Sequence, residues 1–232
     1  MVQPNRLQIK LPDQLQIDKL IVDVVHKMKN NLGGITGFAA LLERDLGEDT
    51  PEGKLVEQIK TSALRLDDLV LDLMTLIRTM HISMEKLHVL PVLQQKIYTY
   101  EDEYERKCEI RNVTGLSDKD VRILSDSIYL DRLFKSLMTV IVKLNAHLKS
   151  VEICSEGDNR IVLKFCLHNL DIELDKKKNL TDIINKYEPV EARLAFHTVL
   201  RLAELLDCEI SADALSHNQL QFNLAFKQEK IS

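Results

Sequence analysis

The residues best placed to do chemistry lie on one stripe of a long helical pattern near the N-terminus. His26 falls on the side of this helix that is opposite its apolar seam, and Asn30 follows four residues later, so the two side chains are neighbours. Gly33 and Gly37 continue the same outer stripe, although glycine inside a helix costs about 1 kcal/mol relative to alanine. This pattern indicates a place where the backbone of a partner comes close to an exposed imidazole. An ordinary surface histidine beside tolerated glycines is the competing interpretation.

Two long helices must position these residues. Asp13 is a suitable N-cap for the first helix, and Gly47 is a suitable stop. Thr50 can cap the second helix, which we expect to continue to about Leu87 and to end before Pro91. Each helix is therefore roughly 30 residues, or about 45 Å, long.

Apolar side chains recur along both helices in alternating steps of three and four residues, as in a coiled coil. This seam consists of Ile17, Ile21, Val24, Met28, Asn31, Ile35, Phe38 and Leu42 in the first helix, and of Ile59, Ser62, Leu66, Leu69, Leu73, Leu76 and Met80 in the second. A second stripe widens the apolar face of the second helix, and its members are Val56, Ala63, Val70 and Ile77. One antiparallel hairpin cannot cover so wide a face. We therefore expect two hairpins to pair as a four-helix bundle in a homodimer.

After Pro91 the pattern changes to short strands mixed with helices. We expect helices at residues 93–106, 129–148 and 189–206, and strands at residues 108–113, 121–124, 151–154, 161–167, 208–212 and 219–226. Residues 176–186 are expected to form a loop or a short helix. The fold class is therefore α+β, with a helical hairpin at residues 13–88 and an α/β sandwich at residues 89–232.

Composition excludes several functional classes. The chain has 232 residues and a formal net charge of −5, which argues against nucleic acid as a partner. Its four cysteines are scattered and form no CxxC pair, so we expect no zinc site and a reducing compartment, the cytoplasm. No segment has the length and apolar character of a signal peptide or a membrane span, so we expect no membrane association.

Residues 23–38 resemble the phosphoacceptor helix of histidine kinases, whose pattern is His, acid, two residues, Asn, Pro, Leu, then Ile and Gly. The matching positions are His26, Asn30, Leu32, Ile35 and Gly37. The two helix lengths also resemble the dimerisation and histidine-phosphotransfer domain of that family. Further along, residues 124–130 resemble the approach to the family's ATP-site helix, and residues 201–206 with the two strands that follow resemble the close of its ATPase-like domain.

The departures from the family pattern concern the nucleotide. Ser136 and Val140 stand where the family has two asparagines that hold Mg²⁺ and nucleotide, and Asn145 could imitate them only after an insertion. The glycine-rich box that contacts adenine falls on residues 168–172, and the later glycine box falls on residues 193–196, neither of which contains glycine. The resemblance therefore implies a degenerate ATPase-like domain that binds neither ATP nor another cofactor of its own.

The phosphoacceptor helix itself departs from the family at two positions. Lys27 replaces the usual acid after the histidine, and a lysine cannot act as a base at neutral pH, although it can attract a phosphoryl group. An ordinary solvated lysine is the competing interpretation. We assign Lys27, Lys29, Gly33 and Gly37 to contact with the phosphoryl group or the partner. Asn31 replaces the usual proline, so we expect the first helix to lack the family's kink.

A chain that keeps the acceptor histidine and loses the ATP site resembles the phosphotransferases that are built on a kinase scaffold. The resemblance implies that His26 passes a phosphoryl group between the aspartates of response-regulator receiver domains, which bring their own Mg²⁺. Asn30 would orient the imidazole, or a water molecule in a receiver phosphatase reaction. Two alternatives stay open at this point: a non-catalytic dimeric scaffold or antikinase that docks on receivers or kinases, and an ATP-dependent kinase with a divergent site.

Overall fold

The computed structural model describes residues 14–47, 49–78, 80–115, 117, 121–157, 159–170, 180–185, 189–216 and 218–228. The chain divides into two compact units, Met1–Thr79 and Met80–Ser232. This division precedes the boundary between residues 88 and 89 that the sequence pattern suggested. Asp13, the expected N-cap of the first helix, lies outside the described residues.

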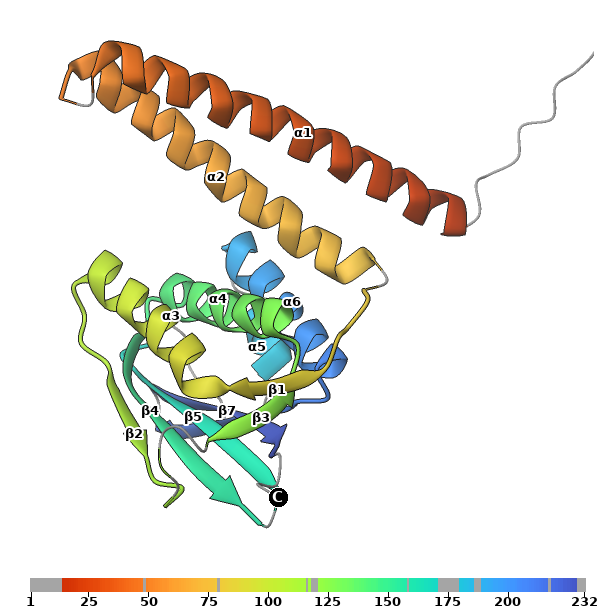
Figure 1. The fold of residues 1–232 in the computed structure, drawn as a ribbon, viewed down its shortest axis with the longest axis vertical. Helices are drawn as coiled ribbons and strands as arrows, with labels where there is room; N and C mark the ends of the chain where they lie inside the picture. Colours follow the sequence, from red (N-terminus) through yellow and green to blue (C-terminus); the bar gives the residue numbers. More distant parts are fainter. Residues whose placement is uncertain are drawn as a thin grey trace, which may run out of the picture. The chain divides into compact units, whose positions relative to one another are not determined.

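The first unit is a hairpin of two antiparallel helices, α1 (Gln14–Leu46) and α2 (Pro51–Ile77), which lie side by side in Figure 1. Gly47 adopts a left-handed conformation with φ of 79°, which favours glycine at the end of α1. The Thr50 hydroxyl then accepts a hydrogen bond of 2.9 Å from the Gly53 N–H and caps α2. A Cβ atom on Gly53 would lie 2.1 Å from the Gly47 carbonyl oxygen, so the turn requires glycine at this position too. The predicted stop and cap are therefore confirmed.

The prediction that the second helix continues to about Leu87 is wrong. Helix α2 ends at Ile77, and strand β1 (Glu85–His88) and helix α3 (Val89–Tyr104) follow. Pro91 lies in the first turn of α3, where its missing N–H has no intrahelical partner to lose. Strand β1 pairs antiparallel with β3 (Arg122–Ser125), a contact that a local pattern cannot reveal.

A five-stranded sheet forms the base of the second unit, in the order β2-β4-β5-β7-β6. Its strands are β2 (Glu109–Asn112), β4 (His147–Glu156), β5 (Arg160–His168), β6 (Glu209–Ser216) and β7 (Gln219–Lys227). Strands β2 and β4 run parallel, whereas the other neighbours run antiparallel. The strands expected in this half of the sequence are thus present.

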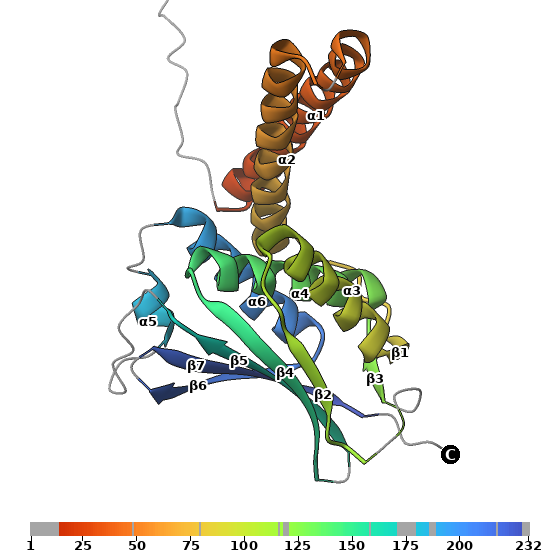
Figure 2. The same ribbon diagram turned by 90° about the vertical axis from the view of Figure 1, so that its left-hand side faces the viewer.

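Helices cover one face of this sheet. Figure 2 shows α3, α4 (Ser127–Lys143) and α6 (Val190–Leu205) on the same side of the strands, and the short α5 (Leu180–Asn185) precedes α6. Helix α4 ends five residues before the predicted Leu148, because residues from His147 onward join the sheet as β4. The core between the two layers includes the fully buried rings of Phe134, Phe165, Phe222 and Phe226. The observed class is α+β, as expected.

Candidate functional site

The inner surface of the hairpin consists of one narrow stripe from each helix. Its buried members include Val25, Leu32 and Ala39 on α1, and Val56, Ala63 and Val70 on α2. Within each of these sets the residues follow one another at intervals of seven, so each set lines up along its helix. The buried Met74 extends the set on α2. The alanines let the two backbones approach closely. The second stripe of the sequence analysis is therefore the one that packs inside the hairpin.

Only part of the wide seam predicted from the sequence contributes to this closed surface, where Ile21 and Leu73 pack against the buried core. Five seam residues of α1 and two of α2, together with Leu55, are instead 44% to 71% exposed. We call this set the open apolar face: Val24, Met28, Ile35, Phe38 and Leu42 on α1, with Leu55, Ile59 and Leu66 on α2. At about 100° per residue, these side chains lie about 40° to 140° round each helix from its buried stripe, in the same rotational sense. Because the helices run antiparallel, both groups come to the same side of the hairpin. The seam is thus available to a second pair of helices.

His26 lies on the opposite side of α1. It is about 100° from Val25 in the other rotational sense, and Asn30, Gly33 and Gly37 are within about 40° of it. All four residues of this histidine stripe (His26, Asn30, Gly33 and Gly37) are exposed. The solvent exposure expected for His26 is therefore confirmed, although the reason differs slightly, since the helix packs on Val25 and not on Val24 or Met28.

The two lysines assigned to this site differ in their relation to the imidazole. Lys29 is three residues from His26, and side chains at this spacing are neighbours on a helix surface. Lys27 is the next residue along the chain, so its side chain leaves α1 about 100° further round. Both are exposed. The fold therefore brings Lys29 and Asn30 close to His26 and directs Lys27 away from it.

The contacts described within the hairpin do not explain why glycine occupies two positions of the histidine stripe. A Cβ atom at Gly33 or Gly37 would meet nothing within 4 Å, and the same holds for Gly34, which lies further round the helix. Among the described residues, no contact requires glycine at these positions. Each glycine nevertheless weakens α1 by about 1 kcal/mol relative to alanine.

Leu64, an apolar side chain on the histidine side of α2, is absent from both stripes predicted from the sequence. Leu64 is 52% exposed and lies about 100° from the buried Ala63, on the side of the hairpin that carries the histidine stripe. The Lys60 Nζ atom is 2.6 Å from Glu43 Oε2, and this pairing sets Leu64 level with the turn of α1 around Gly37. Leu64 belongs to neither apolar stripe, so periodicity gave no signal for it.

The second unit places the residues aligned with nucleotide ligands inside its core. Helix α4 packs on α6, and Val140 of α4 is fully buried, while Ser136, one turn earlier, is 4% exposed. A buried valine offers no oxygen to a metal ion. Asn145 lies beyond the end of α4 with φ of 52°.

The segments aligned with the two glycine boxes are also filled by side chains. Leu170, after the end of β5, is 7% exposed and belongs to the core, whereas residues 171 and 172 lie outside the described residues. Residues 193–196 are helical, and Ala195 and Phe196 of this segment are buried. Gly157 is the last glycine of the sequence, so residues 158–232 contain none. Close approach of backbone to a nucleotide is therefore limited in this half of the unit.

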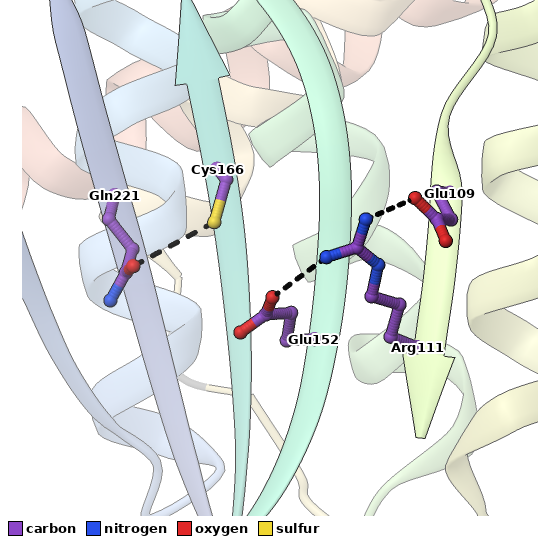
Figure 3. A network of polar contacts seen from close by, with 5 residues as sticks. All are labelled: Glu109, Arg111, Glu152, Cys166 and Gln221. Carbon is purple, nitrogen blue, oxygen red and sulfur yellow. Dashed lines mark hydrogen bonds and ion pairs between the residues drawn. The ribbon is translucent and has the colours of Figure 1, made fainter. Parts of the chain in front are cut away.

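The outer face of the sheet carries a group of polar contacts. Figure 3 shows Arg111 between two carboxylates, with its guanidinium 3.6 Å from Glu152 and hydrogen-bonded to Glu109, which lowers the pKa of Glu109. Nearby, the Cys166 thiol donates to Gln221 Oε1 at 3.7 Å. Burial raises the pKa values of Cys108 and Cys208 to about 12, so neither thiol ionises near neutral pH.

Comparison with known proteins gives one family match and several similar folds. Residues 16–80 match the family described as the His Kinase A (phospho-acceptor) domain. No curated protein sequence matches the chain significantly. Among the described residues, no helix has the length and apolar character needed to cross a membrane.

Three solved structures share the fold. Full-length ShkA in complex with AMPPNP has a TM-score of 0.68 and 16% identity over 93% of this chain and 47% of its own, so the present chain spans about half its length. The histidine kinase AdeS of Acinetobacter baumannii has a TM-score of 0.57 and 14% identity over 88% of this chain and 97% of its own. The histidine kinase ThkA, in complex with the response regulator TrrA, has a TM-score of 0.52 and 11% identity over 91% of this chain and 61% of its own.

Identities this low show a common fold only, whereas the match over residues 16–80 covers the hairpin that carries His26. The chain is therefore similar to histidine kinases in two respects: its hairpin matches the family described as the His Kinase A (phospho-acceptor) domain, and its fold resembles theirs.

Proposed function

We propose that this chain is a histidine phosphotransferase of two-component signalling, in which His26 relays a phosphoryl group between receiver aspartates. The observation that carries the proposal is the placement of His26. Its imidazole is exposed on the side of the hairpin opposite the open apolar face, beside Asn30 and on the same stripe as Gly33 and Gly37, where an added Cβ atom would meet nothing within 4 Å. Such a surface suits a partner that brings its own reactive group to the imidazole.

In this reaction the main contribution of the chain is to position the His26 imidazole for attack. One ring nitrogen of His26 attacks the phosphorus of an aspartyl phosphate on the docked receiver, in line with the aspartate oxygen. The N–P bond forms as the P–O bond breaks, and the aspartate leaves as a carboxylate. The reverse reaction passes the group to a second receiver. Lys29 stabilises the negative charge of the phosphoryl oxygens, and Asn30 orients the imidazole, or a water molecule when the receiver is dephosphorylated.

The second unit supports a source of phosphoryl groups other than ATP. Val140 and Phe196 fill positions where the family holds nucleotide, and no glycine follows Gly157. Mg²⁺ and its acidic ligands would come with the receiver. The complex of the histidine kinase ThkA with the response regulator TrrA supports the choice of a receiver domain as the partner.

The open apolar face supports a homodimer. Its eight side chains are 44% to 71% exposed, and they are Val24, Met28, Ile35, Phe38, Leu42, Leu55, Ile59 and Leu66. Water around so long an apolar face is unfavourable, and a second hairpin with the same face completes a four-helix bundle. Pairing through this face leaves the histidine stripe of each protomer uncovered.

The test of phosphotransfer uses a receiver that carries a radiolabelled phosphoryl group. The wild-type chain is expected to take up acid-labile label, and His26→Gln is expected to take up none while it keeps its fold and its affinity for the receiver. His81→Gln, which alters another exposed histidine, is the matched control and should transfer normally. Label on the His26→Gln variant, or none on the wild type with any cognate receiver, would contradict the proposal.

The open apolar face also favours a second candidate, a scaffold or antikinase that pairs with the hairpin of a kinase. This candidate predicts a stable complex with a receiver or a kinase, and no label on His26. The third candidate is an ATP-dependent kinase, which is relevant because ShkA is described in complex with AMPPNP. Calorimetric titration with Mg-ATP separates it from the others, since our proposal predicts no heat of binding.

A further inference from the structure

Helix α2 ends at Ile77 although the sequence provides no terminator there. The residue that follows, Arg78, is extended, with φ of −103° and ψ of 142°. Residues 78–88 contain neither glycine nor proline, which are the usual signals for the end of a helix. The end of α2 is therefore imposed by contacts elsewhere in the fold.

The apolar repeat of α2 continues beyond the end of the helix. Ile59, Leu66, Leu73, Met80 and Leu87 follow one another at intervals of seven residues. If the helix continued, Met80, Met84 and Leu87 would lie about 60° to 120° from the buried stripe, in the sense that leads to the open apolar face. The same residues thus carry a helical pattern and fold as something else, a conflict between local and global preference.

Three contacts hold residues 80–88 in the observed conformation. Strand β1 pairs with β3 from Glu85 opposite Ser125 to His88 opposite Arg122, and no other described strand pairs with β1. Strand β3 is also bridged to Gln228 through Ile123. A sheet of two strands is only marginally stable by itself. Ile82 and Leu87 pack partly buried against the core of the second unit. The backbone N–H of Ser83 donates a hydrogen bond of 2.8 Å to Asp126 Oδ2.

Asp126 divides its two oxygens between separate tasks. Its Oδ1 atom caps α4 by accepting from the N–H groups of Ile128 at 3.0 Å and Tyr129 at 3.2 Å, whereas Oδ2 accepts only from Ser83 among the contacts described here. The Asp126 side chain is 5% exposed, so water has little access to its Oδ2 atom, whereas Ser83 is an exposed residue. Asp126 is thus the buried acceptor that fixes the segment 43 residues earlier in the chain.

From these observations we propose that residues 80–88 are a conformational switch. In one state they form the observed connection and strand β1, fixed by Asp126 and β3. In the other they continue α2 to about Leu87 and extend its open apolar face by two helical turns or more. Any change that weakens the hydrogen bond from the Ser83 N–H to Asp126 shifts the equilibrium toward the state with the longer α2. This inference does not depend on the chemistry of His26.

The test is Asp126→Asn in the full chain, read by the ¹³Cα chemical shifts of Lys86 and Leu87. Asparagine is an equally good N-cap, so α4 keeps its cap, but an amide NH₂ then faces the Ser83 N–H, which loses its acceptor. We expect both shifts to move from strand values toward helical values. The matched control is Asp131→Asn on α4, which weakens the 2.7 Å ion pair with Lys96 of α3 and should leave both shifts unchanged.

A second variant confirms that the new state is the helix. Glycine disfavours the helix, so adding Met84→Gly to Asp126→Asn should return the Leu87 shift toward its wild-type value. Strand values that persist in Asp126→Asn would overturn the proposal. So would random-coil values, because they would show that the released segment has no helical alternative.

Discussion

Alanine at Gly33 and Gly37 should stabilise the hairpin and at the same time weaken its proposed activity. Both positions are helical, and a Cβ atom at either would meet nothing within 4 Å, so alanine fits without strain. Each replacement should raise the free energy of unfolding by about 1 kcal/mol, and the double variant by about 2 kcal/mol, because alanine is the better helix former. Urea denaturation followed by circular dichroism at 222 nm measures this gain.

The same double variant should transfer phosphoryl groups poorly. If a receiver brings its backbone against the histidine stripe, two added methyl groups hold it away, and a loss of about 1.4 kcal/mol in binding reduces affinity tenfold. We expect at least this reduction in the rate of labelling at subsaturating receiver. The opposite signs are informative, since a merely structural effect of the glycines would move stability and transfer together.

Gly34→Ala is the matched control for this experiment. Gly34 is equally open, but it lies about 80° from His26 around the helix. It should stabilise the hairpin to the same extent and leave transfer unchanged. The reasoning is refuted if the double variant is stabilised and still transfers at the wild-type rate, or if Gly34→Ala impairs transfer as strongly as the double variant does.

Three further predictions concern other parts of the chain. Leu66→Glu on the open apolar face should dissociate the homodimer in analytical ultracentrifugation. Leu64→Glu, at a similar exposure on the histidine side, should leave the dimer intact and reduce receiver binding. If both variants changed dimerisation and receiver binding to the same extent, the two sides of the hairpin would not have different roles. With pKa values of about 12, Cys108 and Cys208 should be about 0.1% thiolate at pH 9 in the folded chain, whereas a thiol with the ordinary pKa of 9.0 is about half thiolate. Iodoacetamide should therefore label both cysteines several-hundredfold faster after unfolding in urea, as measured by mass spectrometry. Burial, assisted by the positive charge of Lys149, lowers the pKa of His168, so protonation favours the unfolded chain and the free energy of unfolding should fall as pH drops through about 6.5. His168→Gln should flatten the dependence of the unfolding free energy on pH between about 7 and 5. An unchanged slope would refute this.

Local signals in the sequence were sufficient where the structure is locally determined. Gly47 and Thr50 act through their own backbone conformation and hydrogen bonds, so the turn of the hairpin could be predicted. The exposure of His26 followed from helical geometry. Strand β1 could not be predicted, because its stability comes from β3 and from an Asp126 that lies 43 residues after Ser83.

The sequence also could not tell which apolar stripe closes the hairpin. The apolar pattern showed a wide seam of large side chains, such as Phe38 and Ile59, and a second stripe on the second helix, and it did not indicate which of them closes the hairpin. The structure closes on a stripe that contains Ala39 and Ala63, because small side chains let two helices approach closely. Leu64 was overlooked for a different reason, because a single leucine outside a periodic stripe gives no pattern.

The opposite placement of His26 and the open apolar face has a consequence for stoichiometry. A dimer built on that face would carry two imidazoles that point in opposite directions, with the whole bundle between them. Each protomer would then serve its own receiver, and neither would obstruct the other. In a mixed dimer with one His26→Gln protomer, half of the capacity to accept label should therefore survive.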